Sequence, residues 1–412
     1  MKQETRDRVA RVLIYLFPAL VDSVVAQVGF VNAIRLAKMG ASASVVAGIA
    51  AVWSLVYMFS CLFVSRMVTP ANAVRMMTGA CISILIICGL FTVVEGTAAI
   101  YVLCSCVGAA TAFFFAPFQV FMKAVDKAGS KPITYSAGLY TFSWSMGFAI
   151  GPFLAGFLME TGSKTADGIE TSGWKWVYLV SGMAVLLTVI GIRLLAHLAH
   201  SLKPARNERH KNGQPTEASS CDYSRMPDLV RLAWIGSGVG VMVFTLIRAV
   251  FPKKAVSILH LADSTQGTIL FLMCMAQALT ALSLCRSRLW MYRPSAVGVF
   301  GLIGLCAALL FGFSSTTLML YCAATLFGIY SGAFFFYLVF HALSHPVKSS
   351  SYVAINEAVV GFAGIVGPMA GGLLADHLGF NIACAAGAAV ILAVTLFQIM
   401  VHSKNREQDP CC

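Results

Sequence analysis

The stretch GLYTFSWSMGFAIGPFLAG, residues 138–156, is apolar enough to be a membrane helix, yet it contains a proline and four glycines. Gly147, Gly151 and Ala155 recur at every fourth position, so they share one helix face. Small residues with this spacing let two membrane helices approach closely. Pro152 has no N–H group, so it frees the carbonyl group four residues earlier and favours a kink. The stretch therefore predicts a helix that packs closely and bends.

The remainder of the chain has the composition of an integral membrane protein. It is 412 residues long, 58% hydrophobic and 11% charged, with a mean hydropathy of +0.81, whereas soluble domains carry about 25% charged residues. A helix needs about 20 apolar residues to cross the hydrocarbon core. We expect an all-α membrane protein with twelve transmembrane helices, at residues 12–34, 44–64, 76–94, 98–122, 136–159, 176–195, 229–250, 266–284, 296–313, 317–340, 353–375 and 381–401.

An internal repeat relates the two halves of the chain. A shift of 216 residues lays GPFLAGFLME, residues 151–160, over GPMAGGLLAD, residues 367–376. The shift pairs Gly151 with Gly367, Pro152 with Pro368, Gly156 with Gly372 and Glu160 with Asp376. The second copy repeats the device of the first, because Ala363, Gly367 and Gly371 share a face beside Pro368.

A polar stretch between the sixth and seventh apolar runs divides the chain. Its charged, Pro, Gly and Ser residues favour a solvated connector. The sequence therefore predicts two six-helix halves, residues 1–199 and 229–402, with a cytoplasmic linker at 200–228 and a cytoplasmic tail at 403–412.

Basic residues predict the orientation of the chain, because Lys and Arg resist translocation. With a cytoplasmic N-terminus, 22 of the 29 basic residues fall on the cytoplasmic side. We expect a multi-pass protein of the plasma membrane or the bacterial inner membrane, with both termini in the cytoplasm. The net charge of +12 then reflects topology and a basic face against anionic headgroups, and requires no nucleic-acid partner.

The twelve spans in two halves, the polar linker and the repeat resemble the major facilitator superfamily. The first stretch is similar to the antiporter signature on the fifth helix of that superfamily, through Gly138, Gly147, Gly151, Pro152, Ala155 and Gly156. The resemblance implies alternating access, in which the halves rock around a central site. It also implies that the fifth helix packs on the eighth and the eleventh on the second.

The loop between the second and third helices departs from the superfamily pattern G-x-x-x-D-R-x-G. Residues 61–68 occupy its frame, but only Arg66 remains, and Ser65 stands at the acidic position. In the superfamily that acidic residue helps to hold the cytoplasmic side closed. Arg66 is the remaining candidate for a gating loop here.

Ionisable residues inside the spans are candidates for function, because a charge near the bilayer centre costs about 2.5 to over 10 kcal/mol. Asp22 lies near the middle of the first span and is the leading candidate for proton coupling. The alternative is a cavity carboxylate bound to Ser23, Gln27 or a substrate amine.

Two further charged residues lie in later spans. Glu357 comes about one turn into the eleventh span, where it could act in the transport cycle or cap the helix, paired with Arg66. Arg248 comes late in the seventh span, where it could attract an anionic substrate or extend to the headgroups. In the superfamily, helices 1, 4, 7 and 10 line the cavity. That implies hydrogen-bonding roles for Gln27, Gln119, Tyr330 and Tyr337, with Phe114 and Phe335 as apolar walls.

No phosphate-binding loop, H-E-x-x-H or G-x-S-x-G arrangement occurs in the sequence. We therefore expect no enzyme activity, no cofactor and no metal site. The first interpretation is a monomeric secondary active transporter in the lipid bilayer that exports a small organic molecule in exchange for protons. The alternatives are a symporter or uniporter for a nutrient such as an organic acid or sugar, and, in another class, a non-transporting membrane sensor.

Overall fold

The computed structural model describes residues 3–69, 71–125, 133–161, 173–200, 229–284, 289–344 and 349–407. Twelve long helices are apolar enough to cross a membrane, which confirms the all-α prediction. The first six are α1 (Gln3–Lys38), α2 (Ala43–Ser65), α3 (Ala73–Phe91), α4 (Thr97–Val125), α5 (Ile133–Thr161) and α6 (Trp174–His200). The second six are α8 (Val230–Ser257), α9 (Asp263–Leu284), α10 (Pro294–Phe313), α11 (Thr317–Ser344), α12 (Ser349–Leu378) and α13 (Phe380–Glu407), with a short 3-10 turn, η2 (Leu289–Tyr292), before α10.

Several helices are longer than their apolar runs. The first begins at Gln3, and the last continues to Glu407 through residues expected to belong to a tail. Hydrophobicity marks only the part of a helix that crosses the hydrocarbon core, and charged residues such as Lys, Glu and Arg are good helix formers beyond it. Most of the expected linker, residues 201–228, and the end of the expected tail, residues 408–412, lie outside the described residues.

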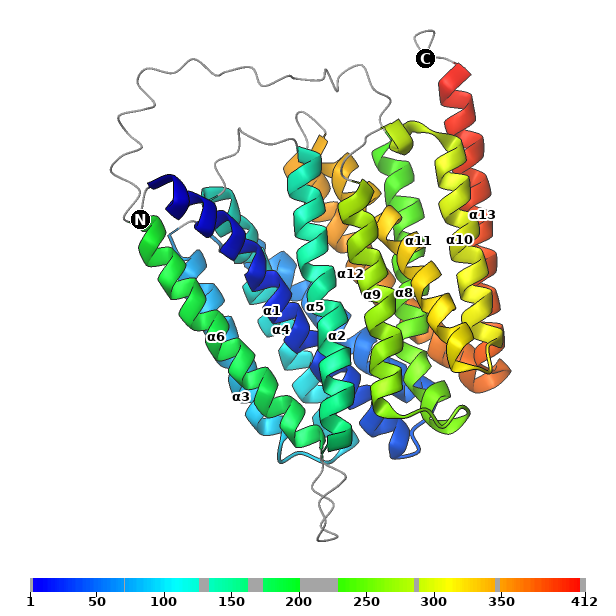
Figure 1. Cartoon of the computed structure of the whole chain (residues 1–412), viewed down its shortest axis with the longest axis horizontal. Coiled ribbons are helices and arrows are strands. Elements are labelled where there is room, and N and C mark those ends of the chain that lie inside the picture. The colour runs from blue at the N-terminus through cyan, green and yellow to red at the C-terminus, as the bar shows by residue number, and fades with distance from the viewer. Residues whose placement is uncertain are drawn as a thin grey trace.

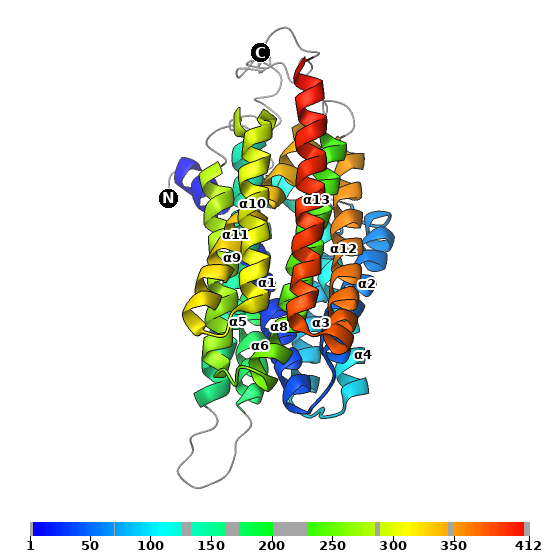
Figure 2. The same ribbon diagram turned by 90° about the vertical axis from the view of Figure 1, so that its right-hand side faces the viewer.

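The helices form two side-by-side groups of six, which we call the first half (α1–α6) and the second half (α8–α13) (Figure 1). Both chain termini lie at one end of the bundle, here called the terminal end, and the opposite end is called the far end. Helices α10 and α13 form the outer edge of the second half (Figure 2). The halves meet mainly where α5 packs on α9 and α2 packs on α12, as the resemblance implies.

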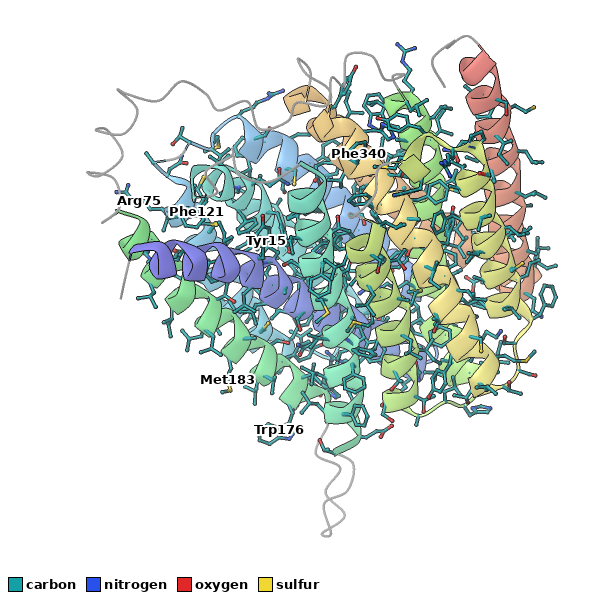
Figure 3. All side chains as sticks on the ribbon, turned by 45° about the horizontal axis from the view of Figure 1, so that its top comes forward. Tyr15, Arg75, Phe121, Trp176, Met183 and Phe340 are labelled. Atoms are coloured by element: carbon teal, nitrogen blue, oxygen red, sulfur yellow. The ribbon has the colours of Figure 1, made fainter. Side chains whose placement is uncertain are left out.

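Large apolar side chains cover the outside of the bundle. Trp176 and Met183 of α6 are 54% and 66% exposed, and they project away from the helices in Figure 3. A surface of this kind fits the acyl chains of a bilayer, where exposed apolar atoms meet no water.

The glycine signature of α5 packs against two different helices, α1 and α9. A Cβ atom added to Gly147 or Gly151 would collide with the backbone of α1 around Ser23, so this face packs inside the first half. Gly156 instead lies against Asp263 at the start of α9. The same division holds in α12, where Gly367 and Gly371 lie against α8 of the same half and Gly372 lies against Ser44 of α2. The small-residue face predicted from the sequence is therefore an intra-half contact, and the end of the motif forms the contact between halves.

This division predicts the result of replacing Gly151 with leucine. The new side chain must displace α1, and overpacking of this kind costs about 1–3 kcal/mol or more. We expect a lower thermal unfolding temperature for the purified protein. Gly79→Leu is the matched control, because a Cβ at Gly79 has no atom within 4 Å. Equal unfolding temperatures for the two variants would contradict the assignment.

Candidate functional site: a cavity between the halves

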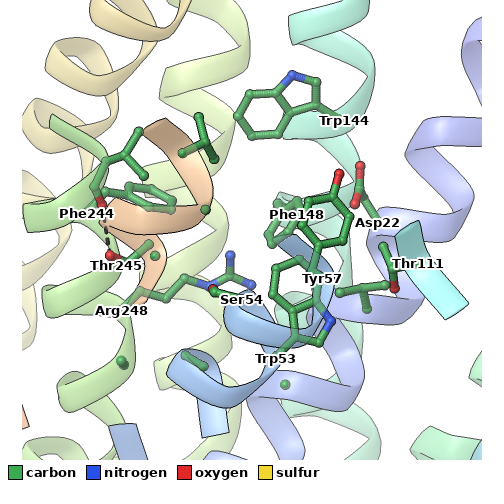
Figure 4. A pocket seen from close by; sticks show the side chains of 18 of the residues that line it. Asp22, Trp53, Ser54, Tyr57, Thr111, Trp144, Phe148, Phe244, Thr245 and Arg248 are labelled. Atoms are coloured by element: carbon green, nitrogen blue, oxygen red, sulfur yellow. Dashed lines mark hydrogen bonds between the residues drawn. The ribbon is translucent and has the colours of Figure 1, made fainter. Parts of the chain in front are cut away.

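A cavity of about 400 Å³ lies between the two halves (Figure 4). Its lining comes from α1, α2, α4 and α5 of the first half and from α8, α9, α11 and α12 of the second. Its wall is mostly apolar and combines aliphatic side chains with nine aromatic ones: Phe30, Trp53, Tyr57, Phe115, Tyr140, Trp144, Phe148, Phe244 and Phe335. Trp53 and Tyr57 stack with ring centroids 5.1 Å apart, and Trp144 meets Phe335 of the other half edge to face at 5.0 Å.

Four of the residues predicted for the site come together in this cavity: Asp22, Gln119, Arg248 and Glu357. In Figure 4, Asp22 projects from α1 on one side and Arg248 from α8 on the other. The Asp22 side chain is 5% exposed, and it forms no hydrogen bond or ion pair within the described residues. A carboxyl group that has no hydrogen-bond partner in a largely apolar wall is costly as an ion, so this position favours a proton or a ligand.

Glu357 of the second half lines the cavity together with three polar side chains of the first half, Tyr57, Gln119 and Tyr140. The structure does not pair Glu357 with Arg66, which is exposed at the end of α2. Only one ion pair joins described residues, and it involves neither of these groups.

Three predicted residues lie away from the cavity. Gln27 donates to Ser23 at 3.2 Å and accepts from Ser181 at 3.0 Å, so it ties α1 to α6. Tyr330 lies against Gly304 of α10. Tyr337 is buried in a cluster with Phe336 and Phe340 near η2. Phe114 also packs inside the first half, on Phe118, whereas Phe335 lines the cavity as expected. The resemblance named four of the eight helices that line the cavity, and it did not fix the rotation of each helix about its axis.

Sequence reasoning missed the residues that α2 and α5 contribute. Tyr57 and Tyr140 line the cavity beside Glu357, and Trp53 has a buried indole N–H with no partner within the described residues. Polar-tipped aromatic residues inside apolar runs were the available signal. The resemblance does not point to these residues, because it assigns the lining to helices 1, 4, 7 and 10.

Contacts between the halves close the far end of the bundle. Lys38 Nζ of α1 lies 2.6 Å from Asp263 Oδ2 of α9. Glu160 at the end of α5 accepts a hydrogen bond from the backbone N–H of Ser264 at 2.9 Å. Asp376 near the end of α12 accepts two, from the backbone N–H groups of Ala43 at 2.7 Å and Ser44 at 3.0 Å.

Glu160 and Asp376 are the acidic residues that the internal repeat pairs. Each one places a carboxylate on the first turn of a helix in the opposite half, where free N–H groups and the helix dipole favour negative charge. We call these two contacts the far-end caps. Together with the ion pair, they join the halves on the side of the cavity away from the termini.

Comparison with known proteins supports the same architecture. No family model and no curated protein matches the chain. Among solved structures, a bacterial homologue of the human lysosomal transporter Spinster, in an inward-facing and occupied conformation, has a TM-score of 0.70 at 14% identity, over 99% of both chains. The same kind of homologue in an unoccupied inward-facing conformation has a TM-score of 0.65 at 13% identity, over 98% of this chain and 96% of that one.

The human organic anion transporter MFSD10 (TETRAN) has a TM-score of 0.59 at 13% identity, over 97% of this chain and the whole of that one. Likeness at these identities is a likeness of fold. With its twelve spans in two groups of six, the chain has the fold of the major facilitator superfamily transporters.

Proposed function

We propose that the chain is a secondary active transporter that moves a small organic molecule across the membrane by alternating access, with Asp22 as the proton-coupling residue. The observation that carries the proposal is the Asp22 carboxyl group, which is buried in a cavity between two halves and has no partner within the described residues. The charged and neutral states of such a group differ strongly in solvation. Its proton occupancy therefore responds to the side on which the cavity opens.

The closed far end supports the alternating-access part of the proposal. The two solved homologues of Spinster are described as inward-facing. We assign the far end to the outside and the terminal end to the cytoplasm, in the plasma membrane or a bacterial inner membrane. A monomer is sufficient, because the cavity is complete within one chain.

Two directions of coupling have support. Efflux in exchange for protons is the first candidate, because α5 carries the antiporter-like signature; it requires proton and substrate to compete for the cavity. Uptake together with protons is the second candidate. It is favoured by the Arg248 guanidinium in the cavity, which could hold an acidic substrate.

The test is a flux assay on the purified protein in liposomes that contain a pH-sensitive dye. Pools of metabolites and amphipathic compounds are added with and without an imposed proton gradient. We expect compound-dependent proton movement that empty liposomes lack, and its sign separates antiport from symport. Substrate flux without proton movement would indicate a uniporter. Absence of any flux would contradict transport and favour a membrane sensor.

A further inference from the structure

We infer that Arg248 binds the acidic group of an amphipathic organic anion, and that such anions are the substrate class of the cavity. The inference rests on the proposed transport function and deepens it. Three features of the structure support it: Arg248 has no hydrogen-bond or ion-pair partner within the described residues, the cavity wall is mostly apolar, and two carboxyl groups share the cavity with Arg248.

Two cations that are buried among the described helices have polar partners, whereas Arg248 is half-buried in the cavity wall. Arg35 is 8% exposed and donates to the Tyr178 hydroxyl at 3.2 Å and to the Val94 carbonyl at 2.6 Å. Lys254 is 4% exposed and donates to three carbonyl oxygens at the end of α10, at 2.8–3.2 Å. Arg248 forms no hydrogen bond and no ion pair within the described part of the chain.

The Arg248 guanidinium is held only by an aromatic face. Its Cζ atom lies 4.4 Å from the ring centroid of Phe148, across the boundary between the halves. A cation–π contact contributes about 0.5–2 kcal/mol, so it compensates only part of the cost of taking the half-buried guanidinium out of bulk water. The guanidinium therefore presents free N–H donors to the cavity. Their planar, forked arrangement matches a carboxylate, sulfonate or phosphate group.

The cavity wall indicates the body of the ligand. Aromatic and aliphatic side chains line the same cavity as Arg248, and the volume of about 400 Å³ lies within the range of small-molecule sites. The unpartnered N–H of Trp53 offers one more donor in the wall. A molecule with an aromatic or alkyl body and one acidic group satisfies both the rings and the guanidinium.

Protons and anion should bind together. The titratable groups that face Arg248 from the surrounding helices are Asp22, Glu357, Cys104, Cys274, Tyr57 and Tyr140. Cysteines and tyrosines ordinarily titrate well above neutral pH, so the two carboxyl groups set the charge of the cavity. Two carboxylates outweigh the guanidinium and repel an anion, whereas two neutral carboxyl groups leave Arg248 as the sole charge. By reciprocity, the anion also promotes proton uptake. Such positive coupling between proton binding and anion binding favours the second candidate direction, uptake together with protons.

The experiment compares three probes that share one ring system: naphthalene carboxylate, naphthalene carboxamide and naphthylmethylammonium. Binding to the purified full-length protein in nanodiscs is measured by calorimetry, at mildly acidic and mildly alkaline pH. We expect the carboxylate to bind at least ~10-fold more tightly than the carboxamide at acidic pH, a difference of about 1.4 kcal/mol. We expect the affinity for the carboxylate to fall as the pH rises, and Asp22→Asn to remove much of that dependence.

Three variants assign the effect to Arg248. Arg248→Gln should lose the preference for the carboxylate while it still binds the carboxamide, which also shows that the cavity is folded. Arg248→Lys should keep part of the preference. Lys253→Gln removes a neighbouring charge of α8 that does not line the cavity, and it should behave as wild type.

The inference is overturned if the wild-type protein binds the carboxamide as tightly as the carboxylate, prefers the ammonium probe, or binds none of the three. Each of these results leaves transport of other compounds intact. Anion binding that depends on Arg248, without any flux in liposomes, would instead support the site and contradict the proposed transport function.

Discussion

Asp22→Asn protein in liposomes will still exchange substrate down its gradient but will no longer couple that movement to protons. Asparagine has nearly the same size as aspartate and cannot ionise, so the cavity keeps its shape and loses one titratable group. Coupling between two ligands typically corresponds to about 1–3 kcal/mol, or roughly 5- to 150-fold in affinity. We therefore expect proton-driven accumulation to fall by at least ~10-fold.

The measurement combines an internal pH dye with counterflow of the substrate found in the flux assay. Glu95→Gln is the matched control, because Glu95 is an exposed acidic residue in the far-end loop between α3 and α4 and lies outside the cavity. That variant should transport as wild type does. Uphill transport by Asp22→Asn at the wild-type rate would remove the coupling role from Asp22 and leave Glu357 as the remaining carboxyl group in the cavity.

Asp376→Asn will open the far end of the bundle. The Asp376 carboxylate accepts two backbone N–H groups of α2; hydrogen bonds to a charged group contribute about 1.5–3 kcal/mol, and solvent reduces this here because Asp376 is exposed. A neutral asparagine offers only one acceptor oxygen. Since about 1.4 kcal/mol corresponds to a factor of ten, the population with a closed far end should fall by up to ~10-fold relative to the open one.

A native thiol can report this opening. Cys104 is buried and lines the cavity, so a membrane-impermeant maleimide added outside intact cells reaches it only through the far end. Peptide mass spectrometry should find faster labelling of Cys104 in Asp376→Asn than in wild type, and no change in Glu95→Gln. Identical labelling rates in the two variants would show that the far end closes without this cap.

Removing the other contacts at the far end should open it to different extents. Glu160→Gln removes a cap with one hydrogen bond, so its effect should be smaller than that of Asp376→Asn. Lys38→Met should have the smallest effect, because the Lys38 side chain is 51% exposed and exposed ion pairs contribute about 0.2–1 kcal/mol. A double variant at Glu160 and Asp376 should increase the labelling rate of Cys104 more than either single variant does.

The fold was predictable because its main determinants are local in the sequence. Span length follows from runs of apolar residues, and the repeat around Pro152 and Pro368 places the two halves in correspondence. The helix that packs against each glycine face was harder to predict from the sequence. Spacing shows that Gly147 and Gly151 share a face, but packing decides that α1 covers this face and that Gly156 meets α9.

Part of the cavity lining was also predictable from local sequence features. Asp22 and Arg248 stand out as charges in apolar runs, and both line the cavity. Gln27 is equally conspicuous, but its amide satisfies Ser23 and Ser181 instead. The direction of a side chain depends on neighbours that are distant in sequence, which no spacing rule supplies.

The far-end caps bear on the origin of the chain. One joins the end of α5 to the start of α9, and the other joins the end of α12 to the start of α2. Exchanging the two halves converts one contact into the other, which is the defining property of an isologous interface in a twofold dimer. Two separate copies of an ancestral six-helix unit would have closed through a pair of identical contacts. The pair of caps, one with glutamate and the other with aspartate, is the arrangement that fusion of two such copies would leave.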